Sequence, residues 1–248
     1  MTLATTGGFR PQLIPALFAA IVVLVCVSLG AWQLQRLEWK SSLIAERQAA
    51  SQSAPVAAPH SLDEARALEF RPVVTEGVFL HDKEIFLGAA SPTGGRPGFQ
   101  VLTPLRQPDG RIVFVNRGYV PSELKDAERR SAGQLAGTVG ISGLLRVPKG
   151  KLGWPVPDNR PDLNYWFWVD LPAMAAAAGL SEVAPFYIDA GATPNPGGWP
   201  KGGVTPINLP NDHLQYAITW FALAVAAAAV YVTWQRQADR ARSPTPPS

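Results

Sequence analysis

A long stretch without charged side chains near the C-terminus most constrains how this chain can fold. Between Asp212 and Arg236 the sequence contains no Asp, Glu, Lys or Arg. About 20 predominantly apolar residues suffice for a helix to cross a bilayer. Asp212, with Gln215 three residues later, forms a capping-box pattern at the start of the run. Residues 210–234 therefore predict a transmembrane helix with its cap. Its many alanines favour close contact with a second helix.

A second apolar run, residues 11–35, lies near the N-terminus. A secretory signal peptide is the alternative, since Ser28 and Gly30 are small enough for a cleavage site. The uncharged run is longer than a typical signal core, and Trp32 and Trp39 suit the interfacial position of membrane anchors. An uncleaved transmembrane helix is therefore favoured.

Two spans place both termini on one side of the membrane. The basic residues near the spans are equally divided between the tails and the intervening segment. Long translocated segments escape the positive-inside bias. We therefore expect cytoplasmic tails and a middle domain outside the cytoplasm. The expected segments are a tail at 1–10, a helix at 11–35, the domain at 36–209, a helix at 210–234 and a tail at 235–248.

The middle segment predicts short strands separated by Gly- and Pro-containing turns. The expected strands are residues 71–79, 84–87, 99–105, 111–115, 139–147, 165–169 and 186–188, with short helices at 61–68 and 171–178. The first two strands are expected to form a hairpin around His81, and the next two flank the turn Gln107-Pro108-Asp109-Gly110. The predicted fold is a membrane α+β protein, with a two-helix transmembrane hairpin flanking a small antiparallel β-barrel or sandwich with short helices.

Composition and motifs argue against several classes of function. The net charge is only +3 and no dense basic cluster is present, so nucleic acid is not an expected partner. The single cysteine, Cys26, permits no intramolecular disulfide. No GxSxG, HExxH, CxxC or phosphate-binding glycine motif occurs. We therefore do not expect an enzyme.

His213 is the main candidate functional residue because it is ionisable and lies at the mouth of the second span. Helical spacing places Tyr216 and Trp220 on its face. Trp32 and Arg36 lie at the outer end of the first span, so a packed hairpin would bring Arg36 towards His213. The residues alone favour a simpler role for His213 as part of the helix cap.

Four stretches resemble the surfeit locus protein 1 family, in that family's order along the chain. They are LGAWQLQRLEWKSSLI (29–44), FRPVVTEGVF (70–79), VNRGYVP (115–121) and PNDHLQYAITWF (210–221). The resemblance implies a bacterial inner-membrane protein with a periplasmic domain that assists assembly of cytochrome c oxidase. The one departure noticed is Tyr119, where the family often has Trp.

The resemblance also implies chemistry, because the family's candidate iron ligand matches His213. The expected cofactor is haem a, held transiently, with His213 as axial ligand, Tyr216, Trp220 and Trp32 as aromatic neighbours and Arg36 as partner of the propionates. Expected partners are oxidase subunit I, haem a synthase as a second candidate, and membrane lipid. The alternative is a scaffold that stabilises subunit I without binding haem.

For four other polar residues, the sequence gives less specific predictions. For Arg71 and Arg117, a structural ion pair and a contact to haem or a partner protein are equally favoured. His60 and His81 fall in predicted loops with no second ligand at metal spacing, so both are expected to be solvated.

Overall fold

The computed structural model describes residues 12–91, 94, 96–205, 207 and 209–242. The chain divides into two compact units. The first comprises residues 1–45 and 208–248, and the second comprises residues 46–207. Each unit is described by itself.

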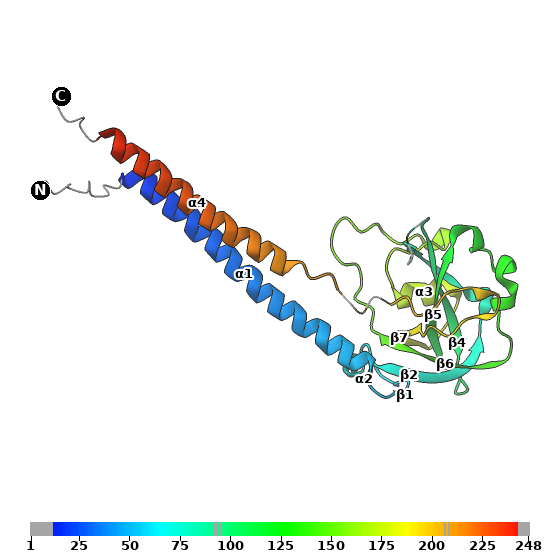
Figure 1. Ribbon diagram of the computed structural model, residues 1–248. Helices are drawn as coiled ribbons and strands as arrows, with labels where there is room; N and C mark the ends of the chain where they lie inside the picture. The colour runs from blue at the N-terminus through cyan, green and yellow to red at the C-terminus, as the bar shows by residue number, and fades with distance from the viewer. Residues whose placement is uncertain (1–11, 92–93, 95, 206, 208, 243–248) are drawn as a thin grey trace, which may run out of the picture. The chain divides into compact units, whose positions relative to one another are not determined.

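Two long helices run side by side in the first unit: α1 (Leu13–Ser51), whose residues 46–51 belong to the second unit, and α4 (His213–Arg242) (Figure 1). They are antiparallel, since Gln12 contacts Gln235 while Ser41 accepts a hydrogen bond from Asn211. Gly30 permits close approach, because a Cβ at this position would lie 2.8 Å from the Phe221 ring.

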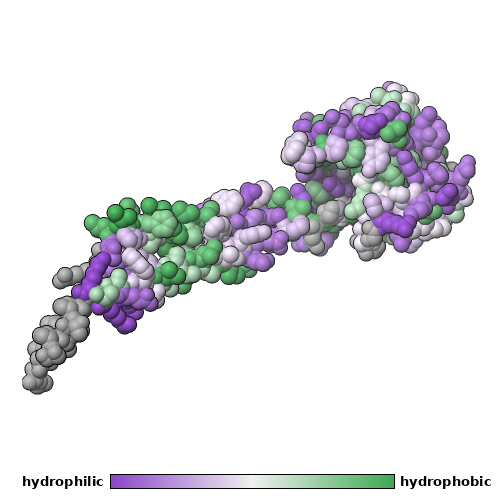
Figure 2. Space-filling view, turned by 90° about the horizontal axis from the view of Figure 1, so that it is seen from above, coloured by the Kyte–Doolittle hydropathy of each residue, from purple (hydrophilic) through white to green (hydrophobic). Residues whose placement is uncertain are grey.

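The alanine-rich face of α4 packs against protein, as expected. Ala217 is 1% exposed and Ala224 is 6% exposed. Both helices are long and apolar enough to cross a membrane. Most of their apolar side chains point outward, including Leu17, Phe18, Leu24, Val225 and Val230. Figure 2 shows the resulting apolar band over the paired helices. These features suggest a membrane protein.

The first helix extends beyond the predicted span. It continues through Ser51, whereas the sequence-based boundary between helix and outer domain lies at Gln35. Residues 36–51 contain neither glycine nor proline and are rich in good helix formers. The loss of hydrophobicity after residue 35 therefore does not end the helix.

The second unit is a small β-barrel with short helices (Figure 1). Its strands are β1 (Val56–Ala57), β2 (Pro72–Phe79), β3 (Ile85–Ala89), β4 (Gly98–Arg106), β5 (Ile112–Pro121), β6 (Thr138–Arg146) and β7 (Val183–Ala190). Its α-helices are α2 (Leu62–Ala67) and α3 (Leu171–Ala178). The 3-10 turns are η1 (His81–Lys83), η2 (Ser122–Leu124), η3 (Ala127–Gly133), η4 (Pro161–Leu163) and η5 (Pro196–Gly198).

The sheet closes on itself. Its strand order is β1-β2-β6-β7-β5-β4-β3, and an additional pairing joins β2 to β4. Thus β2, β6, β7, β5 and β4 form a ring, which confirms the barrel. The expectation of an antiparallel barrel is wrong at one seam of the ring, because β5 and β7 are parallel. The short edge strand β1 also pairs with β2 in parallel. A closed ring with an odd number of strands cannot be antiparallel at every pair.

The strand β5 is buried on both faces. Val113 and Val115 join the barrel interior with Val73, Leu145 and Ile188. Phe114 points the other way, into a second core formed by Trp166, Leu171, Met174 and Tyr187. Because α3 covers this outer face, β5 is a nearly continuous buried run rather than an alternating one.

Three strand expectations need correction. Residues 84–87 do not form a hairpin with β2: η1 redirects the chain, and β3 pairs with β4. Residues 165–169 form only isolated bridges. There the Asn159 amide oxygen accepts hydrogen bonds from the backbone of Phe167 and Trp168, in place of a neighbouring strand. The strand predicted to end at Val115 continues to Pro121, whereas the predicted β4–β5 hairpin is confirmed.

Gly118 permits a close backbone contact within the second unit. Its φ is +112°, and a Cβ there would overlap the carbonyl oxygen of Lys201. Tyr119 and Lys201 exchange two backbone hydrogen bonds of 2.9 Å beside this contact. Gly110 also has positive φ, +88°, but a Cβ there would meet no atom within 4 Å.

We expect Gly118→Ala to destabilise the protein much more than Gly110→Ala. Both substitutions incur the cost of positive φ, about 1–2 kcal/mol, but only the first also displaces the Lys201 backbone. Thermal or urea unfolding of the full chain in detergent, followed by tryptophan fluorescence, measures the difference. Equal losses in the two variants would contradict the close contact.

Candidate functional site

His213 is the first residue of α4 and faces α1. Its Nδ1 lies 2.7 Å from Oε1 of Gln33, and the side chains are partly buried. An amide oxygen only accepts hydrogen bonds, so Nδ1 is the donor in this arrangement. In the neutral ring, Nε2 then keeps its lone pair.

This hydrogen bond gives the histidine the form of a metal ligand. Ligating histidines typically donate their second ring nitrogen to an oxygen acceptor, which fixes both tautomer and ring orientation. Gln33 supplies that acceptor. The donor set therefore fits a group that needs one imidazole ligand, such as a haem iron.

The other predicted site residues are at least partly exposed. Tyr216 is 57% exposed and Trp32 is 49% exposed. Trp220 is half-buried, two turns along α4 from His213. These aromatic groups lie on the helices that carry His213 and Gln33, and they are positioned by helical spacing alone.

Arg36 is exposed, and its guanidinium carbon lies 4.5 Å from the Trp39 ring centre. Among the described residues it forms no ion pair. The partner of His213 on α1 is Gln33, one helical turn earlier. The guanidinium of Arg36 remains available for an anion.

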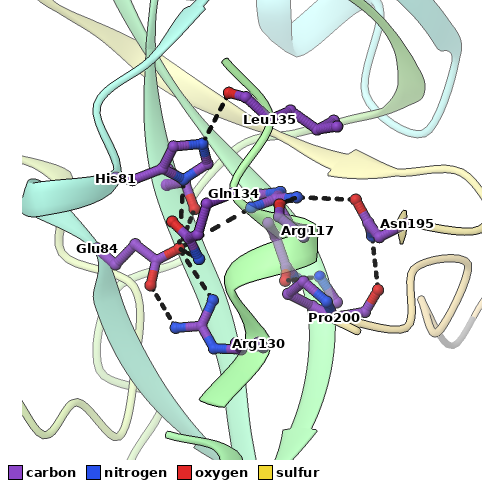
Figure 3. A network of polar contacts seen from close by, with 12 residues as sticks. His81, Glu84, Arg117, Arg130, Gln134, Leu135, Asn195 and Pro200 are labelled. Carbon is purple, nitrogen blue, oxygen red and sulfur yellow. Dashed lines mark hydrogen bonds and ion pairs between the residues drawn. The ribbon is translucent and has the colours of Figure 1, made fainter. Parts of the chain in front are cut away.

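A second polar site lies in the β-barrel unit, where Glu84, Arg117 and Arg130 form a buried cluster (Figure 3). Their side chains are 4%, 2% and 1% exposed, respectively. Arg130 from η3 donates to both carboxylate oxygens of Glu84. Arg117 from β5 forms a longer ion pair, with Nη1 3.9 Å from Glu84 Oε1.

Further contacts fix the Arg117 guanidinium. Nη2 donates to the Gly133 carbonyl oxygen at 2.5 Å and to Asn195 Oδ1 at 2.8 Å. Asn195 in turn donates to the Pro200 carbonyl oxygen at 2.6 Å. The Phe79 ring lies 4.8 Å from the guanidinium carbon, within cation–π range.

His81 belongs to the same cluster, so its prediction as a solvated loop residue is wrong. Its side chain is 19% exposed, and its Nδ1 lies 3.7 Å from Glu84 Oε1. Nε2 donates to the Leu135 carbonyl oxygen at 3.0 Å. His60, by contrast, is exposed as predicted.

In this cluster, the net effect of burial and the neighbouring charges lowers the pKa values of both Glu84 and Arg117. Burial by itself would raise the pKa of the Glu84 carboxyl, but His81, Arg130 and Arg117 outweigh it and lower the pKa to about 2. Burial also lowers the pKa of Arg117 to about 10; Glu84 opposes this shift, and the charge of Arg130 adds to it. The Glu84 carboxylate is therefore ionised at neutral pH.

Sequence analysis missed Gln33, Glu84 and Arg130 as site residues. One signal was present: an arginine within the apolar strand VFVNRGYV needs a buried carboxylate partner. The structural ion pair considered for Arg117 is found. Arg71 differs, because its Nε donates to the Ala54 carbonyl oxygen at 3.3 Å. No sequence signal identifies Gln33, which is one of several glutamines on that helix.

Comparison with known proteins gives one consistent result. The sequence matches the SURF1 family over residues 20–225. A SURF1-like protein from Monosiga brevicollis is 37% identical over 87% of this chain and 85% of its own length. Surfeit locus protein 1 from Homo sapiens is 35% identical over 84% of this chain and 73% of its own. A SURF1-like protein from Drosophila melanogaster is 34% identical, covering 89% and 76%.

Glu84→Gln is expected to destabilise the protein by about 3–5 kcal/mol at pH 7, because it leaves two buried guanidinium groups without their carboxylate. The pKa of Glu84 is lowered from 4.5 to about 2. Its contribution to stability is therefore present above pH 4.5 and is lost as the pH falls towards 2. Unfolding measured across this range should show a steeper acid loss in the parent than in Glu84→Gln.

The matched control is Glu123→Gln, which alters an exposed ion pair with Arg96. Such pairs contribute little, so this variant should unfold almost as the parent does. A parent and a Glu84→Gln variant with the same pH dependence would contradict a buried, ionised Glu84.

Proposed function

This chain belongs to the SURF1 family, and on that basis we propose that it is an assembly factor for cytochrome c oxidase. In this proposal it holds haem a transiently and assists its insertion into subunit I. The resemblance of the motif around His213 to the family's candidate iron-ligand motif supports the proposal. We further propose a bacterial inner-membrane location, with both termini cytoplasmic, the barrel unit periplasmic, and no catalytic activity of its own.

The hydrogen bond between His213 and Gln33 is the observation that carries this proposal. The bond occupies Nδ1 and orients the ring, so Nε2 is the nitrogen left for iron. A helix cap alone does not require an acceptor supplied from a second helix. The bond therefore favours a ligand role over the simpler capping role.

A carrier must release what it holds. His213 is half-buried at a helix end; Tyr216 on the same helix and Trp32, which precedes Gln33 on α1, are about half exposed. This open setting suits ligation that a recipient protein can displace. Haem a, when bound, supplies the iron that accepts the imidazole nitrogen. The residues of this chain bind, orient and then release that group.

The other expected residues take supporting roles in the proposal. Tyr216, Trp220 and Trp32 provide aromatic surface for the macrocycle, and Arg36 provides a cation for a propionate. The barrel unit is proposed to contact subunit I, with haem a synthase as a further candidate partner. The alternative remains a scaffold that stabilises subunit I without binding haem.

The test is to purify the full chain after co-expression with the enzymes of haem a synthesis and to measure bound haem by absorption and extraction. We expect His213→Ala to lose most of the bound haem. Gln33→Leu should weaken binding about 10–100-fold, the usual effect of removing an outer hydrogen bond to a ligand. His60→Ala, which alters an exposed histidine, is the matched control.

Equal haem content in the parent and His213→Ala would remove His213 from the ligand role. A parent that contains no haem, with oxidase assembly still dependent on the chain, would favour the scaffold. A scaffold predicts that His213→Ala still co-purifies with subunit I although the purified chain contains no haem. A haem carrier predicts that the parent contains haem and that His213→Ala loses it.

A further inference from the structure

A cavity of about 200 Å³ opens at one end of the β-barrel. Phe79, Val115, Ile141 and Ala190 reach it from four strands of the barrel, and Leu135 also lines it. The mouths of β-barrels are common sites for small ligands. The cavity therefore has the position and the apolar lining of a binding site.

One cation lines this cavity, and it is not fully hydrogen-bonded. Arg117 is 2% exposed, and its Nη1 forms no hydrogen bond within the described part of the chain. Its nearest ion-pair contact, to Glu84 Oε1, is 3.9 Å long. A buried donor without a partner is costly and calls for an explanation. Figure 3 shows this guanidinium bonded to Asn195, which also lines the cavity.

The charges around the cavity are also unbalanced. Glu84 is the sole carboxylate that pairs with Arg117 and Arg130 among the described residues, so two cations share one anion. Asp189, the other buried acid in the described part of the chain, is engaged by Arg146 at 2.7 Å and by Asn116 at 2.7 Å. An excess positive charge therefore remains next to the cavity, where an anion would neutralise it.

The residues that line the cavity indicate which kind of anion it would bind. The Arg117 guanidinium and the side chains of Ser142, Thr193 and Asn195 are the polar groups, and the remaining side chains are mostly apolar. A phosphate is usually held by several charged or backbone donors. A carboxylate on a short aliphatic chain needs one cation and an apolar wall. The volume suits a molecule of only a few carbon atoms, or the carboxylate arm of a larger one.

We propose that this barrel-end cavity binds a small aliphatic carboxylate, with the Arg117 guanidinium as the cation that neutralises it. The same chemistry has two possible sources: a free short-chain carboxylate, or the carboxylate arm of a larger ligand such as a porphyrin. The proposal stands on the barrel unit alone and does not depend on the function proposed for His213.

The test measures thermal unfolding of the full chain in lipid nanodiscs with increasing sodium propionate, against sodium chloride at equal ionic strength. Binding to the native state raises the unfolding midpoint with ligand concentration. We expect Ala190→Leu to weaken this effect about tenfold or more, because it fills the cavity and leaves Arg117 in place. Ala184→Leu, the same substitution in β7 but outside the cavity, is the matched control and should respond as the parent does.

A second variant tests the cation. Arg117→Lys keeps the charge but loses the planar guanidinium and its donors, so we expect about tenfold weaker binding or more. If this variant does not fold, Ala190→Leu decides the matter by itself. Inorganic phosphate, added in the same way, should stabilise the parent less than propionate does.

Two further ligands separate the sources of the carboxylate. Iron-free protoporphyrin IX carries two free propionates, and its dimethyl ester carries none. Stabilisation by the free acid alone, weakened in Ala190→Leu, assigns the cavity to the arm of a larger ligand. Stabilisation by propionate alone assigns it to a free carboxylate. The proposal is overturned if neither acid stabilises the parent, or if Ala190→Leu responds as fully as the parent.

Discussion

The buried carboxylate of Glu84 is the interaction on which the barrel unit most depends. It binds Arg130 from η3 and pairs with Arg117 from β5, while His81 from η1 lies beside it. Removing two guanidinium groups and a carboxylate from water costs several kcal/mol per ion, so the arrangement persists only when each member has partners. The turn before β3, the strand β5 and the long β5–β6 connection are consequently held in one place.

This dependence explains why the end of the barrel is polar on one side and open on the other. Val113 and Val115 fill the interior, and the next inward-facing position of β5 is Arg117. At that level the apolar core gives way to a charge that is bound to Glu84, Gly133 and Asn195. The cavity begins beside this charge. The change from packed core to cavity therefore occurs within two residues of a single strand.

In the helical unit, small residues bring the two helices together, and a polar contact orients one side chain. α1 and α4 pack through small residues such as Gly30, Ala217 and Ala224, which bring the backbones close. The hydrogen bond between His213 and Gln33 lies at the end of that contact and engages one imidazole nitrogen, Nδ1. The apolar packing fixes the distance between the helices, and the hydrogen bond fixes the orientation of the ring.

The sequence alone determined the features that follow from local pattern. These are the two apolar helices, most strands of the barrel, the β4–β5 hairpin with its turn, and His213 at the start of α4. Only the tertiary structure decided the pairing of β3 with β4, the parallel β5–β7 seam, and the partners Gln33 and Glu84. The reason is physical: hydrophobic period and turn chemistry act over a few residues, whereas Gln33 and His213 lie 180 residues apart in the sequence. Their contact exists only once the chain has packed.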